Sequence, residues 1–200
     1  MRSPFTMSRA VPAIVAGLAV AMISAAPARA QSDNPLTGRL MIGGSTPSGG
    51  IKDRYDAGGL VGVQASYRIN KFLDVTANSA WQNAPLIRAD NVGDNSTAWT
   101  IDAGLEGRMP SIARTMGSMT IQPYIGAGWG QRSYNLSKSL GTSTTSSVTY
   151  AALGGDFNTS GMWGFRLEAR DYFGSFNDPE RLTPKKSGSD LGIAIGVTLK

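Results

Sequence analysis

Three ionisable side chains stand at alternate positions in the segment Arg166-x-Glu168-x-Arg170. A spacing of two places all three on one face of a β-strand. Such a face can bind the carboxylate of a substrate, or it can hold Glu168 in a structural ion-pair cluster, which is the reading we favour. Further ionisable side chains lie on the polar faces of other predicted strands, opposite the apolar residues. The complete predicted set is Arg68, Asp74, Asp102, Glu106, Arg108, Arg166, Glu168, Arg170 and Asp190.

The residue types that are missing narrow the chemistry. The chain contains no histidine and no cysteine, so it offers no Ser-His-Asp triad, no thiol nucleophile and no zinc-thiolate site. No phosphate-binding loop or dinucleotide motif follows a strand and opens a helix. We therefore predict no catalytic residue, no cofactor and no metal site. Four loop aspartates, Asp53, Asp56, Asp90 and Asp94, could contact calcium, but without ordered ligand spacing we interpret them as solvated charges.

Residues 1–30 are typical of a secretory signal peptide. Two arginines give a positive start, an apolar run covers residues 11–26, and Ala28 and Ala30 supply the small side chains of a cleavage site. The run is shorter than the about 20 apolar residues that a membrane-spanning helix needs. We predict cleavage after Ala30 and a mature domain over residues 31–200.

Removal of this segment changes the charge of the chain. The sequence holds 19 Lys and Arg against 14 Asp and Glu, a formal net charge of +5. Residues 1–30 contain three of the arginines and no acid, which leaves 16 basic against 14 acidic side chains, or +2. So small an excess gives no support to nucleic-acid binding.

The rest of the sequence alternates between apolar and small or polar residues in eight segments. In the last of them, Leu191, Ile193, Ile195 and Val197 alternate with glycine, alanine and threonine. This period of two predicts strands with one apolar face. The predicted strands cover residues 38–45, 58–69, 72–82, 98–108, 119–134, 148–157, 162–173 and 189–199, and the facing of the sixth is left open.

The links between the predicted strands alternate in length. Long polar loops at 46–57, 83–97, 135–147 and 175–188 contrast with tight turns at 70–71 and 158–160 and an intermediate link at 109–118. Membrane β-barrels show this asymmetry, with the short turns in the periplasm. Most predicted strands also reach the about 9–11 residues needed to cross a bilayer, longer than the strands of a periplasmic β-sandwich. The expected fold is all-β, an eight-stranded antiparallel transmembrane β-barrel.

An eight-stranded barrel is about wide enough for side chains to fill its interior. The nine predicted charges belong in this lumen, since Arg or Lys on the lipid face costs about 2–4 kcal/mol near the bilayer midplane. Five acids against four bases are nearly balanced, so we predict a lumen filled by ion pairs. The alternative is a narrow path for ions or small solutes.

Aromatic residues fall mostly near the ends of the predicted strands. Trp and Tyr concentrate at the two interfaces of a membrane, and we assign this position to Trp81, Trp99, Trp129, Trp163 and Tyr172. A sugar-binding aromatic cluster is the alternative, although no loop concentrates several of these residues.

Three motifs point to a known family. The closing segment Asp190-x-Gly192-x-x-Ile195-x-Val197 is similar to the C-terminal signal that the barrel-assembly machinery reads, although many members end in Phe and this chain ends in Leu199-Lys200. The segment 165–172, followed by a loop and the last strand, looks like the penultimate hairpin of such proteins, and 122–128 resembles a recurrent Pro-Tyr-x-Gly-x-Gly strand. The mature chain thus resembles the small outer-membrane β-barrel proteins, the OmpA-like and OmpX-like porin-family surface antigens.

The resemblance implies a monomer in the outer membrane of a Gram-negative bacterium, in contact with membrane lipid and lipopolysaccharide and inserted by the barrel-assembly machinery. We expect a structural and surface role, with a narrow porin-like channel as the alternative. Barrel enzymes of this membrane, such as lipid A deacylases, palmitoyltransferases and omptin proteases, use a catalytic histidine that this chain lacks. We therefore expect no enzyme, and one that uses Asp or Ser without His is the remaining alternative.

Overall fold

The computed structural model describes residues 35–50, 52, 55–85, 95–135, 143–176 and 186–199. The predicted signal peptide lies outside these ranges, so its cleavage stays a prediction. No helix in the described part of the chain is long and apolar enough to span a membrane.

Within the described residues, eight long strands and one short strand account for almost all regular structure. The single helical turn, η2 (Pro110–Ile112), begins with a proline that presets the backbone for the turn. The strands are β1 (Leu36–Gly49), β2 (Gly58–Asn70), β3 (Leu73–Pro85), β4 (Asn95–Arg108), β5 (Arg114–Met116), β6 (Met119–Asn135), β7 (Ser143–Thr159), β8 (Trp163–Phe176) and β9 (Lys186–Leu199).

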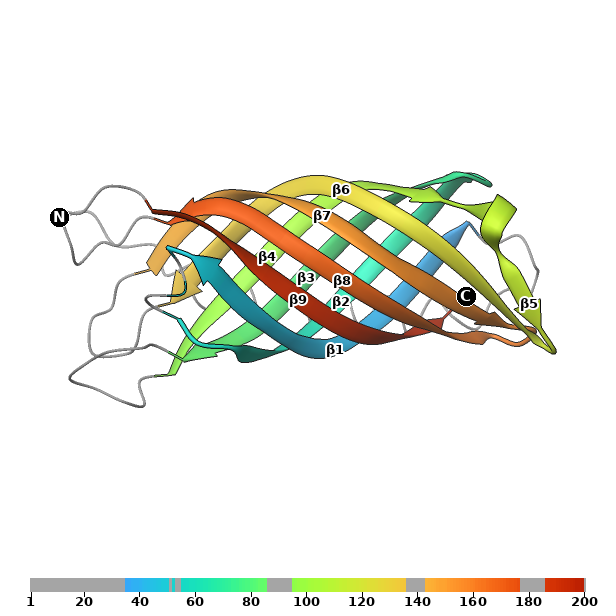
Figure 1. Cartoon of the computed structure of the whole chain (residues 1–200), viewed down its shortest axis with the longest axis horizontal. Coiled ribbons are helices and arrows are strands. Elements are labelled where there is room, and N and C mark those ends of the chain that lie inside the picture. The colour runs from blue at the N-terminus through green and yellow to red at the C-terminus, as the bar shows by residue number, and fades with distance from the viewer. Residues whose placement is uncertain are drawn as a thin grey trace, which may run out of the picture. The chain divides into compact units, whose positions relative to one another are not determined.

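The long strands pair in chain order, and the sheet closes on itself. Each is antiparallel to its neighbours; β1 pairs with both β2 and β9, and β4 pairs with β6 to complete the circuit. The register is staggered around the barrel. A path that starts at Gly38 and moves from each residue to its paired residue on the next strand returns to β1 at Ser48, ten residues further along. A stagger of this kind tilts the strands by about 35–45°, and Figure 1 shows them coiling around a common axis.

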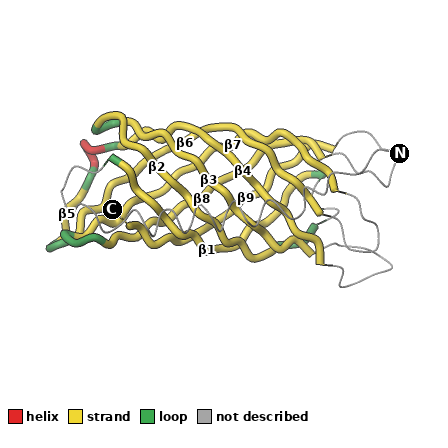
Figure 2. Tube along the Cα trace, turned by 180° about the vertical axis from the view of Figure 1, so that it is seen from behind, coloured by secondary structure: helices red, strands yellow, loops and turns green. Residues whose placement is uncertain are grey.

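The two ends of the barrel differ in their connections. The turn end carries the links 71–72, 109–118 and 160–162, and Figure 2 shows η2 and β5 there. The loop end carries the links 50–57, 86–94, 136–142 and 177–185, most of which lie outside the described residues. In bacterial membrane barrels the short turns face the periplasm, which assigns the turn end to that side.

The outward surface is apolar and the interior is polar. Large outward side chains are about half exposed, among them Leu40, Ile42, Ile101, Leu105, Ile125, Leu153, Leu167, Ile193 and Ile195. Buried polar side chains in the described strands include arginines, aspartates, glutamates and glutamines. This reversal of the usual burial is typical of a barrel surrounded by lipid. It confirms the predicted all-β fold, an eight-stranded antiparallel transmembrane barrel.

The strands run further than predicted at the loop end. There β7 begins at Ser143 instead of residue 148, and β9 begins at Lys186 instead of residue 189. The added outward positions are polar, so no apolar alternation marks them, yet the backbone pairing continues. Side-chain hydroxyls also pair across strands there, with Ser133 Oγ 2.9 Å from Thr145 Oγ1.

Candidate functional site

Arg166 of β8 lies at the centre of the charged interior, with its side chain fully buried. Its guanidinium donates to Glu106 Oε1 at 2.5 Å, to Glu168 Oε2 at 3.0 Å and to Asp156 Oδ1 at 3.2 Å. The guanidinium carbon also lies 3.7 Å from the ring centroid of Tyr124, whose hydroxyl donates to Glu168 at 2.9 Å. One cation therefore holds three carboxylates that come from β4, β7 and β8.

Toward the loop end, the same chain of contacts continues through Arg170. This side chain donates to Glu168 Oε1 at 2.8 Å and to Asp102 Oδ1 at 2.7 Å. The second oxygen of Asp102 accepts from the Tyr172 hydroxyl at 2.7 Å and from Asn78 Nδ2 at 3.0 Å. The Asp102 carboxylate is thus paired with a cation and accepts three hydrogen bonds.

Toward the turn end, the contacts continue through Arg108. Its Nε donates to Asp74 Oδ2 at 2.6 Å, and its Nη1 lies 3.3 Å from Asp156 Oδ2. Arg39 Nη2 lies 3.6 Å from the same Asp156 oxygen. At the barrel mouth, Arg68 Nε lies 3.8 Å from Asp74 Oδ1.

We call the nine buried charges joined by these contacts the central network. They alternate in sign around the lumen, so each carboxylate lies next to at least one guanidinium. Buried charges are tolerated only when they are paired in this way. The members are Arg39, Asp74, Asp102, Glu106, Arg108, Asp156, Arg166, Glu168 and Arg170.

A second, smaller group of polar side chains lies nearer the loop end, and we call Arg132, Asp190 and Gln82 the loop-end cluster. Arg132 donates to both Asp190 and Gln82. Its guanidinium carbon is 5.3 Å from the ring centroid of Tyr134 and 5.6 Å from that of Tyr172. Tyr172 therefore lies between the two groups, with its hydroxyl on the central network and its ring toward Arg132.

Small cavities surround Tyr172. One of about 30 Å³ lies between the central network and the β1–β2–β9 wall and is lined by Met41, Leu60 and Arg170 among others. Two of about 10 Å³ are lined by Arg132 and Asp190. Spaces of this size hold a water molecule or two. The loop-end cluster thus has room for water beside its charges.

Two predicted site residues are corrected by the structure. Arg68 was expected inside the lumen, but its side chain is 49% exposed, because it lies two residues from the end of β2 at the open mouth of the barrel. Tyr172 was expected at a membrane interface, but it is buried in the lumen. It shares the inward face of β8 with Arg166 and Arg170, so its hydroxyl reaches Asp102 rather than lipid headgroups.

Three members of the charged interior were missed by the sequence reasoning: Arg39, Arg132 and Asp156. The sequence did hold a signal for the first two. Arg39 lies on the strand face opposite the apolar Leu40 and Ile42, and Arg132 lies an even number of residues from Gln122, on the same polar face. Asp156 had no such signal, because Gly154 and Gly155 precede it and β7 has few large apolar residues to reveal its outward face.

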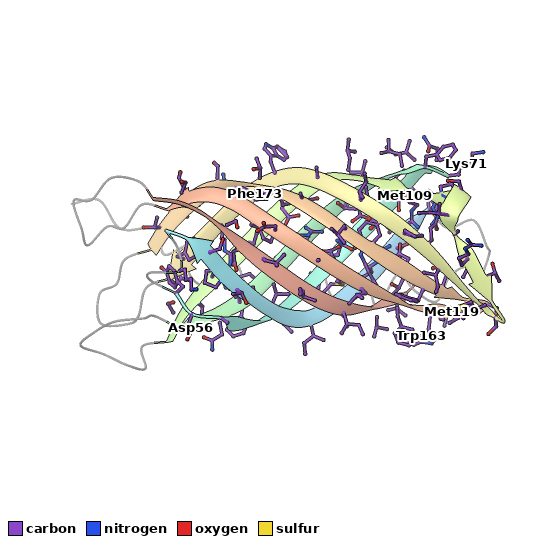
Figure 3. All side chains as sticks on the ribbon, viewed as in Figure 1. Asp56, Lys71, Met109, Met119, Trp163 and Phe173 are labelled. Carbon is purple, nitrogen blue, oxygen red and sulfur yellow. The ribbon has the colours of Figure 1, made fainter. Side chains whose placement is uncertain are left out.

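The four tryptophans all lie outside the lumen. Trp129 and Trp163 are more than half exposed, and Trp81 pairs with Trp99 in the β3–β4 register. Figure 3 places Trp163 at the turn end. Their contact with the membrane interfaces stays a prediction.

The closing motif divides between the two faces of β9. Ile195 and Val197 point outward and are exposed, while Gly192 lines the inner wall beside the cavities. Asp190 is buried against Arg132. Its role as an assembly signal stays a prediction.

Of the four loop aspartates considered for calcium, the structure describes one. Asp53, Asp90 and Asp94 lie outside the described residues, and Asp56 is exposed. In the described ranges, no group of three or more His, Cys, Asp or Glu side chains could hold a metal ion.

Solved structures share this architecture at low sequence identity. Neisserial surface protein A (NspA) aligns with a TM-score of 0.57 at 12% identity, covering 83% of this chain and 97% of that one. OprG from Pseudomonas aeruginosa aligns with a TM-score of 0.50 at 15% identity, covering 82% and 95%. The outer membrane protein AlkL aligns with a TM-score of 0.52 at 10% identity, covering 86% and 93%. These likenesses concern the fold alone.

The sequence itself identifies the family. A search of curated proteins found no match to the chain. The family model described as "Outer membrane protein beta-barrel domain" matches residues 15–198, nearly the whole chain. The chain belongs to this family of outer-membrane β-barrel proteins and is located in the outer membrane of a Gram-negative bacterium.

Proposed function

We propose that this protein is a closed barrel with a structural and surface role in the outer membrane, and that it is not an enzyme. The barrel wall holds the chain in the bilayer, and the loop end meets the environment or a host. Under this proposal the lumen serves no ligand, because side chains of the barrel itself occupy it.

The observation that carries this proposal is the burial of Arg166. Its guanidinium contacts Glu106, Asp156 and Glu168 and packs on the Tyr124 ring, so strands β4, β6, β7 and β8 all contribute to filling the lumen at this level. An ion that passed this point would have to separate several buried pairs at once. Separating even one buried pair costs about 3–5 kcal/mol.

Conductance in planar lipid bilayers tests the proposal. Folding is verified first by the gel mobility of boiled against unboiled protein, which differs for closed barrels. We expect the folded protein to produce no regular conductance steps. Reproducible steps from protein that shows the folded mobility would contradict the closed lumen.

A narrow channel is the second candidate, and the cavities around Tyr172 favour it. These separate cavities lie between the loop-end cluster and the central network and are lined by Arg132, Arg170 and Asp190 among others. Under this alternative, conductance would appear and would rise when Arg170 is shortened. Under the closed-barrel proposal, that variant stays silent.

We further propose that the protein is a monomer, contacts lipopolysaccharide in the outer leaflet, and is inserted by the barrel-assembly machinery through its last strand. Exposed Ile195 and Val197 support a lipid-facing apolar row on β9. Ile195→Arg is expected to block insertion in cells, whereas Thr198→Ser on the inner face is tolerated. Equal amounts of folded, heat-modifiable protein from both variants would contradict the proposed facing.

A further inference from the structure

The turn end carries an exposed surface in which apolar and basic side chains alternate. We call it the turn-end rim. Its apolar members are about half to two-thirds exposed, from 52% for Phe72 to 66% for Met116, and its two basic members are also exposed. The rim comprises Ile69, Lys71, Phe72, Ile112, Arg114 and Met116.

The two parts of the rim come from neighbouring connections. Lys71 Nζ lies 4.9 Å from the ring centroid of Phe72 in the β2–β3 turn. The backbone carbonyl of Phe72 accepts from Arg108 N at 2.7 Å, which fixes this turn to the end of β4. The chain then continues through η2 into β5, which pairs with β6 and presents Arg114 and Met116. Figure 3 shows Lys71 and Met109 at the same end of the barrel.

The rim continues the apolar outer surface of the barrel. Tyr67 and Trp163, each 53% exposed, lie on the outward face just inside the turn end. Aromatic side chains of this kind sit at the level of lipid headgroups. Lys and Arg at the same end of the barrel can lay their aliphatic stems on the apolar surface and place their charges among those headgroups.

The exposed charges among the described residues of the turn end have one sign. Among the described residues, the turn end exposes Arg68, Lys71 and Arg114 and no carboxylate, since Asp74 and Asp156 are buried in the lumen. The described part of the loop end exposes charges of both signs, with Lys52 and Asp56. The outward positions nearest the loop end are hydroxyls such as Thr145 and Ser189.

We propose that the turn-end rim is a binding surface for the headgroups of anionic phospholipids in the periplasmic leaflet. Lys71 and Arg114 contact the lipid phosphates, and Phe72, Ile112 and Met116 enter the acyl-chain boundary beside them. A basic residue at a membrane surface attracts anionic lipid with a strength that salt screens. The rim would thereby hold the barrel at a fixed depth.

Native mass spectrometry of the folded protein in detergent tests this binding. The protein is offered equal amounts of phosphatidylglycerol and phosphatidylcholine with identical acyl chains, and the ratio of the two bound lipids is measured. We expect phosphatidylglycerol to dominate at low salt. The double variant Lys71→Gln/Arg114→Gln should lower the ratio about fivefold for each basic residue removed. Lys52→Gln, which removes an exposed lysine at the other end, should leave the ratio unchanged.

A second variant separates the apolar part of the rim from its charge. Met116→Ser should reduce the total lipid bound and leave the ratio of the two lipids unchanged. An equal preference for both lipids in the parent protein would overturn the proposal, as would an equal loss of preference in Lys52→Gln. If the double variant keeps the lipid ratio of the parent protein but no longer binds a protein of the periplasm, the rim binds a protein partner and the lipid proposal is overturned. Heat-dependent gel mobility confirms that each variant is folded.

Discussion

The central network and the loop-end cluster fill the same lumen in different ways. In the central network, Arg166 is shared by Glu106, Asp156 and Glu168, and the last two acids also pair with other arginines of the network. In the loop-end cluster, Arg132 has Asp190 as its one carboxylate partner among the described residues, with neutral Gln82 beside it. The first group therefore cannot lose one charge without unbalancing several others, whereas the second can be removed as a pair.

The space for water distinguishes Arg132 from Arg166, while the cavity of about 30 Å³ borders Glu168 and Arg170 at the edge of the central network. The cavities lined by Arg132 and Asp190 lie toward the loop end, where water can relieve an unpaired charge. Arg166 is packed against Tyr124 with no exposed surface. We expect substitutions at the centre to be more costly than the same substitutions near the loop end.

The largest effect is expected for Arg166→Met, which leaves three carboxylates facing one another without their shared cation. The free energy of unfolding should fall by about 3–5 kcal/mol. Urea unfolding of the protein in lipid vesicles, followed by tryptophan fluorescence, measures this change. Lys52→Met serves as the control, because Lys52 is exposed outside the lumen and its replacement should change stability by less than about 0.5 kcal/mol. An unchanged unfolding midpoint for Arg166→Met would rule out the shared-cation interpretation.

The loop-end cluster should respond more weakly, and its loss should be repairable. Arg132→Met leaves Asp190 unpaired, and we expect a loss of about 3 kcal/mol, the lower limit for a broken buried pair. The double variant Arg132→Met/Asp190→Asn removes both charges and should recover most of that loss. The matched double variant Arg166→Met/Glu106→Gln should recover a smaller part of its loss, since Asp156 and Glu168 still lack the guanidinium that they shared and keep only their other arginine partners. If both double variants recover the same share of the lost free energy of unfolding, the central network and the loop-end cluster do not differ in the way proposed.

The sequence was informative where alternation and burial coincide. The period of two correctly placed Ile195 and Val197 outside and Glu168 and Arg170 inside, because each strand has a lipid face and a lumen face. The number of alternating segments also predicted the number of strands and, with their length, the closed barrel. These features could be predicted because the alternation is a local pattern within each strand.

The pairing of the charges could not be read in this way. Asp156 contacts Arg39, Arg108 and Arg166, which come from three other strands, and only the stagger of the closed barrel brings them to one level. Tyr172 was misplaced for a related reason. Its position near a predicted strand end indicated an interface, but β8 continues to Phe176, so parity rather than distance from the end decides its environment.

An intermediate effect is expected for Tyr172→Phe, which tests the link between the two groups. The change removes the 2.7 Å hydrogen bond to Asp102 and retains the ring beside Arg132. A hydrogen bond to a charged group contributes about 1.5–3 kcal/mol, and we expect the lower value because Arg170 and Asn78 still bind Asp102. The same urea titration measures it. A loss as large as that of Arg166→Met would show that the two groups act as one.

The smallest effect is expected for Arg68→Gln, at the edge of the central network. Arg68 and Asp74 are 3.8 Å apart, and the half-exposed guanidinium is screened by water. An exposed pair contributes about 0–1 kcal/mol, and Asp74 keeps its buried partner Arg108. Arg108→Gln is the matched comparison, because it removes the other guanidinium from the same carboxylate and should cost several times more. If the two variants unfold at the same urea concentration, burial does not set the strength of these pairs. Any difference between an ion pair in the lumen and one at its mouth would then have to come from the distance and orientation of the paired groups.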